Sequence, residues 1–74
     1  MRITVPDHAK FRIMERGIDV DDAKRIVSKP ESQKIQADGA ILVKGTAVNG
    51  KKLTIIFEQK NKNHIVIITG YYEN

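Results

Sequence analysis

Two turn dipeptides, Asp38-Gly39 and Asn49-Gly50, divide the second half of the chain into runs rich in β-branched residues. Asp-Gly and Asn-Gly favour the tight turns with positive φ that close β-hairpins. The polar segment at residues 60–63 separates two further runs of this kind. The sequence therefore predicts four antiparallel strands, at residues 32–37, 40–48, 51–59 and 64–72.

The residues before the strands predict two short helices that meet at a corner. Thr4 or Asp7 can cap the first helix, and Pro6 is tolerated in its first turn. Gly17 is expected to end this helix, because glycine adopts the left-handed conformation of a C-cap at little cost. Ile18 is then expected to fold back onto the apolar side of the helix, near Phe11 and Met14.

The second helix has an N-cap at Asp19 and an end signal at Pro30, which disfavours helical backbone just before it. Its apolar stripe consists of Val20, Ala23, Ile26 and Val27. The order of elements predicts a single α+β domain over residues 1–74. Two short N-terminal helices are expected to pack on a four-stranded antiparallel β-meander.

The predicted register determines which strand residues share a face of the sheet. A two-residue turn at Asn49-Gly50 places Val48 opposite Lys51, and the helices then cover the face of Leu53, Ile55, Phe57 and Tyr72. No helix remains for the other face. That face carries apolar residues typical of a partner surface, and we expect a second copy of the chain or another protein to cover Ile41, Val43, Ile56, Ile65 and Ile67. A slip of one residue exchanges the two faces.

Composition excludes several classes of protein. The chain has no cysteine, and its two histidines lie far apart without a ligand-like spacing, so we expect neither a metal site nor a cofactor. No apolar run approaches the roughly 20 residues of a membrane span, and the N-terminus lacks a signal-peptide pattern, so a cytoplasmic protein without membrane contact is expected. The P-loop, dinucleotide-binding and zinc-protease motifs are absent from the sequence.

A stripe of basic residues on the first helix is the best candidate for chemistry. His8, Arg12 and Arg16 follow one another at four-residue steps and therefore share one helix face. Guanidinium groups fit phosphate oxygens, and histidine exchanges protons near neutral pH. The formal charge of +4 also favours a polyanionic or acidic partner. The alternative is a solvated face on which Glu15 and Asp19 pair with Arg16.

Three further residues are candidates for RNA contact. Tyr71 and Tyr72 end the last strand and can stack on bases, as aromatic side chains do in single-strand binding proteins. Lys44 interrupts an apolar strand and can supply a cation at the rim of the sheet. In the alternative, the tyrosines are ordinary strand residues, and the stem of Lys44 packs on Leu42 while its amine reaches water.

The motif His8-x3-Arg12-x2-Glu15-Arg16-Gly17-Ile18 resembles that of a small prokaryotic family of unknown function, which looks related to the RelE/ParE/BrnT-like toxins. The resemblance extends to the terminal Ile-Thr-Gly-Tyr-Tyr at residues 68–72. It implies a RelE-like fold, a cognate antitoxin as partner and, in active members, cleavage of mRNA without metal. Other members of the wider superfamily poison DNA gyrase, and fold-level analogy does not choose among these activities.

The leading expectation is thus a toxin-like, metal-independent endoribonuclease of a toxin–antitoxin pair. His8 is its proton-transfer residue, Arg12 and Arg16 hold phosphate, and Tyr71 or Tyr72 contacts the RNA. The alternative is a non-catalytic interaction module that forms a homodimer or binds a partner protein through its apolar sheet face. A third possibility is nucleic-acid binding without cleavage, with an affinity that falls steeply with salt.

Overall fold

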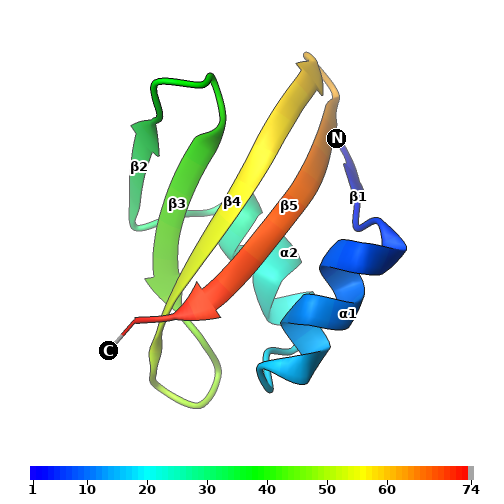
Figure 1. The fold of residues 1–74 in the computed structure, drawn as a ribbon. Helices are drawn as coiled ribbons and strands as arrows, with labels where there is room; N and C mark the ends of the chain where they lie inside the picture. The colour runs from blue at the N-terminus through cyan, green and yellow to red at the C-terminus, as the bar shows by residue number, and fades with distance from the viewer. Residues whose placement is uncertain (74) are drawn as a thin grey trace.

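Two helices lie against one face of a twisted five-stranded sheet in the computed structural model, which describes residues 1–73 (Figure 1). Along the chain the elements are β1 (Arg2–Thr4), α1 (Asp7–Glu15), α2 (Val20–Ser28), β2 (Ser32–Ile35), β3 (Ile41–Thr46), β4 (Lys52–Asn61) and β5 (His64–Tyr72). Their order in the sheet is β1-β5-β4-β3-β2. The α+β class, the two helices and the antiparallel meander from β2 to β5 are confirmed. Neither helix in the described part of the chain is long and apolar enough to cross a membrane.

The prediction of only four antiparallel strands is wrong, because β1 adds a fifth. β1 pairs in parallel with β5, with Arg2 opposite His64 and Thr4 opposite Val66. Three residues are too few to show a strand period in the sequence. Their pairing depends on bringing the N-terminus beside the last strand, which no local pattern encodes.

Gly17 ends α1 as predicted. Its φ is +76°, its N–H donates to the carbonyl of Met14, and the N–H of Ile18 donates to the carbonyl of Ile13, both at 3.0 Å. These two bonds form a Schellman motif. Ile18 accordingly packs in the core with Ile13, and the expected contact with Phe11 and Met14 is wrong because both face solvent.

The two helices begin in different ways. Pro6 occupies the N-cap position of α1 without a side-chain bond, so neither Thr4 nor Asp7 caps this helix. In α2 the carboxylate of Asp19 accepts from the N–H of Asp21 at 2.8 Å, as predicted. The helix ends at Ser28, two residues before Pro30.

The β3–β4 turn contains three residues, one more than predicted. Ala47 lies opposite Lys51, and the N–H groups of Ala47 and Gly50 donate to the carbonyls of Lys51 and Ala47, both at 2.9 Å. Gly50 has a φ of +87°, which fits a type I turn followed by a bulge glycine. The β4–β5 turn is also shorter than predicted, since β4 continues to Asn61. The longer β3–β4 turn shifts the register of that pair by one residue, and bulges at Gln59/Asn61 and Ile56/Phe57 shift the register of β4 and β5 along the strands.

These shifts reverse the faces predicted for β3 and much of β5. Val43, Ile65 and Ile67 lie in the core under the helices, and Ile41 packs against it, so the prediction that they form an uncovered partner surface is wrong. Of the five residues predicted for the partner surface, only Ile56 lies on the face away from the helices. Leu53, Ile55 and Phe57 are buried beneath the helices as predicted. We call the face away from the helices the open face; it carries Leu42, Lys44, Thr54, Ile56, Val66, Thr69 and Tyr71.

Candidate functional site

Arg16 reaches from the end of α1 to the outer edge of β5. One guanidinium nitrogen donates to Thr69 Oγ1 at 3.1 Å and to the carbonyl of Gly70 at 2.9 Å. β1 pairs with this edge only as far as Val66, so the guanidinium contacts the part of β5 that β1 leaves uncovered. No ion pair of Arg16 occurs within residues 1–73, and the alternative pairing with acidic neighbours on its own corner is therefore absent there.

Tyr71 and Lys44 share the open face next to this contact. Both lie opposite Thr54, on either side of β4, so the three residues form one row across the sheet. Tyr71 follows Thr69 by two residues on the same strand, a separation of about 7 Å. The structure thus gathers Arg16, Tyr71 and Lys44 around the C-terminal half of β5.

Glu73 joins this row as an acidic member. Its Oε1 lies 2.6 Å from the Nζ of Lys44, and this hydrogen bond, with the charge of Glu73, raises the pKa of Lys44 above its ordinary value. The amine is therefore paired, and the prediction that it simply reaches water is incomplete. Sequence reasoning missed Glu73, because a lone acidic residue after the last predicted strand carries no signal.

The hydroxyl of Thr54 lies buried in the middle of the row. Thr54 is 1% exposed, and its Oγ1 has no hydrogen-bond partner among the described residues. Buried polar groups are nearly always paired in folded proteins, so each exception calls for an explanation. The hydroxyl of Thr54 therefore places a buried polar group on the open face, between Lys44 and Tyr71.

His8 and Arg12 lie on α1 farther from this row. Both side chains are exposed, and neither has a side-chain hydrogen bond or ion pair within the described part of the chain. A four-residue step rises about 6 Å along a helix, so His8 and Arg16 are about 12 Å apart along the helix axis. The stripe therefore presents one guanidinium held by hydrogen bonds and, within residues 1–73, two exposed side chains without such bonds.

Tyr72 lies apart from the candidate site. Successive strand residues point to opposite faces, and Tyr72 packs against the core on the helix side. Its hydroxyl donates to the carbonyl of Gly17 at 3.2 Å and accepts from Asn49 at 3.1 Å. These contacts link the helix corner to the β3–β4 turn. Tyr72 lies on the helix side as predicted, and Tyr71 is the tyrosine that shares the open face with Lys44.

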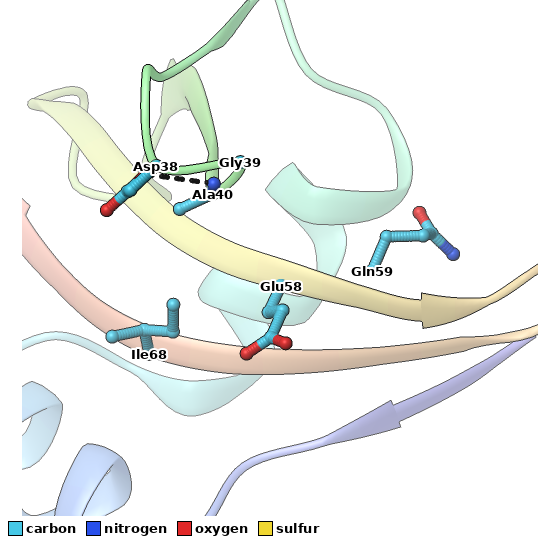
Figure 2. A pocket seen from close by; sticks show the side chains of 6 residues that line it. All are labelled: Asp38, Gly39, Ala40, Glu58, Gln59 and Ile68. Atoms are coloured by element: carbon cyan, nitrogen blue, oxygen red, sulfur yellow. Dashed lines mark hydrogen bonds between the residues drawn. The ribbon is translucent and has the colours of Figure 1, made fainter.

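A shallow hollow of about 350 Å³ lies at the other end of the open face (Figure 2). Asp38 accepts from the N–H of Ala40 at 3.0 Å and thereby closes the β2–β3 turn, while Glu58 pairs with Lys60 at 3.2 Å. Figure 2 shows Glu58 and Ile68 projecting to the same side of the sheet. Two carboxylates in its lining make this hollow a poor site for phosphate. Within residues 1–73 no group of three or more histidine or acidic side chains is placed to hold a metal ion.

Comparison with known proteins assigns the chain to a family. The profile of DUF4258, a domain of unknown function, matches residues 6–72, and the chain therefore belongs to this family. The match contains all of α1 and all of β5, and hence the whole candidate site except Glu73. None of the curated proteins and none of the solved structures matches the chain.

Proposed function

We propose that this protein is a toxin-like endoribonuclease that cleaves mRNA without a metal ion and is held in check by a cognate antitoxin in the cytoplasm. The observation that carries the proposal is the contact of Arg16 with Thr69 and Gly70, because it joins the basic stripe of α1 to Tyr71 and Lys44. The RelE-like fold is part of the proposal. The order of two short helices and a meander supports it.

The chemistry requires a proton acceptor, a cation and a proton donor around one phosphodiester. The RNA 2′-oxygen attacks the adjacent phosphorus while its proton goes to a base. The bond to the 5′-oxygen then breaks, and the leaving oxygen takes a proton from an acid. The products are a 2′,3′-cyclic phosphate and a 5′-hydroxyl.

The residues of the site fit separate parts of this reaction. Arg12 lies one helix turn from His8, so it can stabilise the charged phosphorus centre at which His8 exchanges a proton. Arg16 is held in place by β5 and can hold a neighbouring phosphate of the same strand. His8 has a free imidazole for proton transfer, and the ring of Tyr71, 39% exposed, can stack on a base.

The proposal is tested with purified protein and RNA in the presence of EDTA. We expect cleavage by the native chain and a loss of about 100-fold or more in Arg12→Ala and His8→Ala, as for removal of one transition-state donor. Lys10→Ala is the matched control, because it removes a charge from the same helix outside the stripe. Undiminished cleavage by a His8→Ala, Arg12→Ala double variant contradicts the mechanism.

A second candidate is a non-catalytic interaction module. It is favoured by the open face, where Leu42, Ile56 and Val66 are only half-buried and Ile68 is 36% exposed. This candidate predicts a homodimer or a stable complex and no RNA turnover. Sedimentation of the native chain and of Ile56→Asp tests it, since only the native chain should associate.

A further inference from the structure

A second cluster of polar side chains lies at the opposite end of β5 from Arg16. Arg2 and Thr4 come from β1 and His64 begins β5, so residues from both ends of the chain meet there. The Arg2 Nη2 atom lies 3.2 Å from His64 Nδ1, and Thr4 Oγ1 lies 2.8 Å from His64 Nε2. The imidazole is therefore oriented on both sides.

The guanidinium of Arg2 contacts both nitrogens of the His64 ring. Its Nη2 atom lies 3.2 Å from Nδ1 and 3.5 Å from Nε2, so it lies over the face of the imidazole. A guanidinium has five N–H donors and no acceptor, so Arg2 can also donate hydrogen bonds to an anion.

The surroundings of the cluster suit an anion. Arg2 and His64 line a hollow of about 270 Å³ together with Asn61 and Asn63. Every one of these side chains can donate a hydrogen bond, and no acidic residue lines the hollow. Arg2 forms no ion pair within residues 1–73, so its charge is not neutralised there. The acidic hollow of Figure 2 has the opposite character.

We propose that this hollow binds a phosphoryl group, supplied by the end of an RNA strand. This inference rests on the proposed action on RNA. The hollow is smaller than the roughly 300–1,000 Å³ of pockets that enclose whole small molecules, so it takes one group of a larger molecule. His64 and Thr69 are five residues apart on β5, about 17 Å, and β1 and Arg16 share the outer edge of this strand. One strand held by Arg16 can therefore place a terminal phosphate in the hollow beside Arg2 and His64.

The same contacts also hold β1 on the sheet, and a purely structural role predicts no response to phosphate. The imidazole resonances of His64 are therefore followed by NMR during titration with inorganic phosphate, with chloride at equal ionic strength as the reference. We expect a saturable shift with phosphate alone. Resonances that follow ionic strength only would overturn the proposal.

Variants test which residues make the site. Arg2→Ala should weaken phosphate binding about tenfold or more, as expected for a lost charge-assisted contact. Asn63→Ala should also weaken it, and it leaves strand pairing intact because only the backbone carbonyl of Asn63 receives the N–H of Arg2. Lys62→Ala removes a neighbouring charge outside the lining and should change affinity less than about twofold. Equal losses in Arg2→Ala and Lys62→Ala contradict a specific site.

RNA oligonucleotides with a 5′-phosphate, a 3′-phosphate or neither end phosphorylated identify the source of the phosphoryl group. Tighter binding of one phosphorylated form, abolished by Arg2→Ala, supports the terminal phosphate of RNA. Equal binding of all three RNAs would show that the end of an RNA strand is not the source of the phosphoryl group. If inorganic phosphate still shifts the His64 resonances in that case, the ligand of the hollow is free phosphate. The native chain can also fail to cleave RNA and still bind a phosphorylated RNA end through Arg2. That result would contradict the proposed nuclease activity and support the phosphoryl site.

Discussion

The guanidinium of Arg16 donates a hydrogen bond to the backbone carbonyl of Gly70, 2.9 Å away and 54 residues later in the chain. An open strand edge is a template for pairing with other chains, and natural proteins cover such edges. Arg16 covers one carbonyl of β5 beyond the end of β1. Arg16, a candidate phosphate-binding residue, therefore also helps to stabilise the sheet.

Arg16→Ala should lower the free energy of unfolding by about 1–2 kcal/mol, because two hydrogen bonds are lost and one edge carbonyl is left to water. Urea denaturation measures this change, and sedimentation should reveal weak self-association through the opened edge. Arg12→Ala removes a similar side chain without such contacts and should stay within about 0.5 kcal/mol of the native value. Equal effects of the two substitutions would count against the edge contact.

Gly70→Ala should destabilise the protein by about 1–3 kcal/mol through overpacking. An added Cβ would lie 2.6 Å from Ile55 Cδ1, the far end of a side chain. Ile55→Val removes that atom, so the double variant should be more stable than the sum of the two single changes predicts. Gly45→Ala meets Ile26 at Cγ1, Cγ2 and Cβ, at 2.8–3.3 Å, and Ile26→Val should relieve it less, since Val keeps all three positions.

Ile67→Asp and Ile56→Asp should have different outcomes, although the sequence alone placed both residues on one surface. Ile67 is fully buried, so an aspartate there leaves an unpaired carboxylate in the core and should unfold the domain. Ile56 is half-buried on the open face, and Ile56→Asp should remain folded. Circular dichroism and thermal melting distinguish the two cases. A folded Ile67→Asp variant would contradict the register of β5.

Tyr71→Phe should retain RNA affinity, whereas Tyr71→Ala should lose about 1–3 kcal/mol of it, because stacking depends on the ring and not on the hydroxyl. Fluorescence anisotropy with a short single-stranded RNA gives both values. Tyr72→Phe keeps the ring but loses the bonds to Gly17 and Asn49. Tyr72→Phe should therefore lower the stability and leave RNA affinity unchanged. A loss of RNA affinity in Tyr72→Phe but not in Tyr71→Ala would exclude the open face as the RNA-binding face.

The stability of the protein should depend on pH through Glu31. Its carboxylate accepts hydrogen bonds from Lys52 and Thr46, both at 2.7 Å, and these bonds hold the pKa of Glu31 below its ordinary value of 4.5. A lowered pKa means that the contribution to stability is present above pH 4.5 and is lost as the pH falls through the folded-state pKa. Glu31→Gln should therefore be less stable than the native chain at neutral pH, and the difference should shrink below pH 4.5. Urea titrations at several pH values check this.

Local signals account for the elements that the sequence alone could predict. Gly17 ends α1 and Asp19 begins α2, since both effects depend on one residue and its neighbours in the chain. The glycines at 39 and 50 have φ of +90° and +87°, so both dipeptides mark turns as predicted, although each turn contains three residues and not two. The meander followed from these turns, and the stripe of α1 followed from helical spacing.

Only the tertiary structure decided which residues meet. One extra residue in the β3–β4 turn moves Val43 from one face to the other, because side chains alternate along a strand and a turn dipeptide does not set the turn length by itself. The pairing of β1 with β5, the reach of Arg16 to Gly70 and the meeting of Arg2 with His64 all join positions more than 50 residues apart. The sequence by itself therefore determined the elements from α1 to β5 and the basic stripe, but not β1. The packing of the helices on the sheet decided which of these basic residues is fixed beside Tyr71 and which remain free.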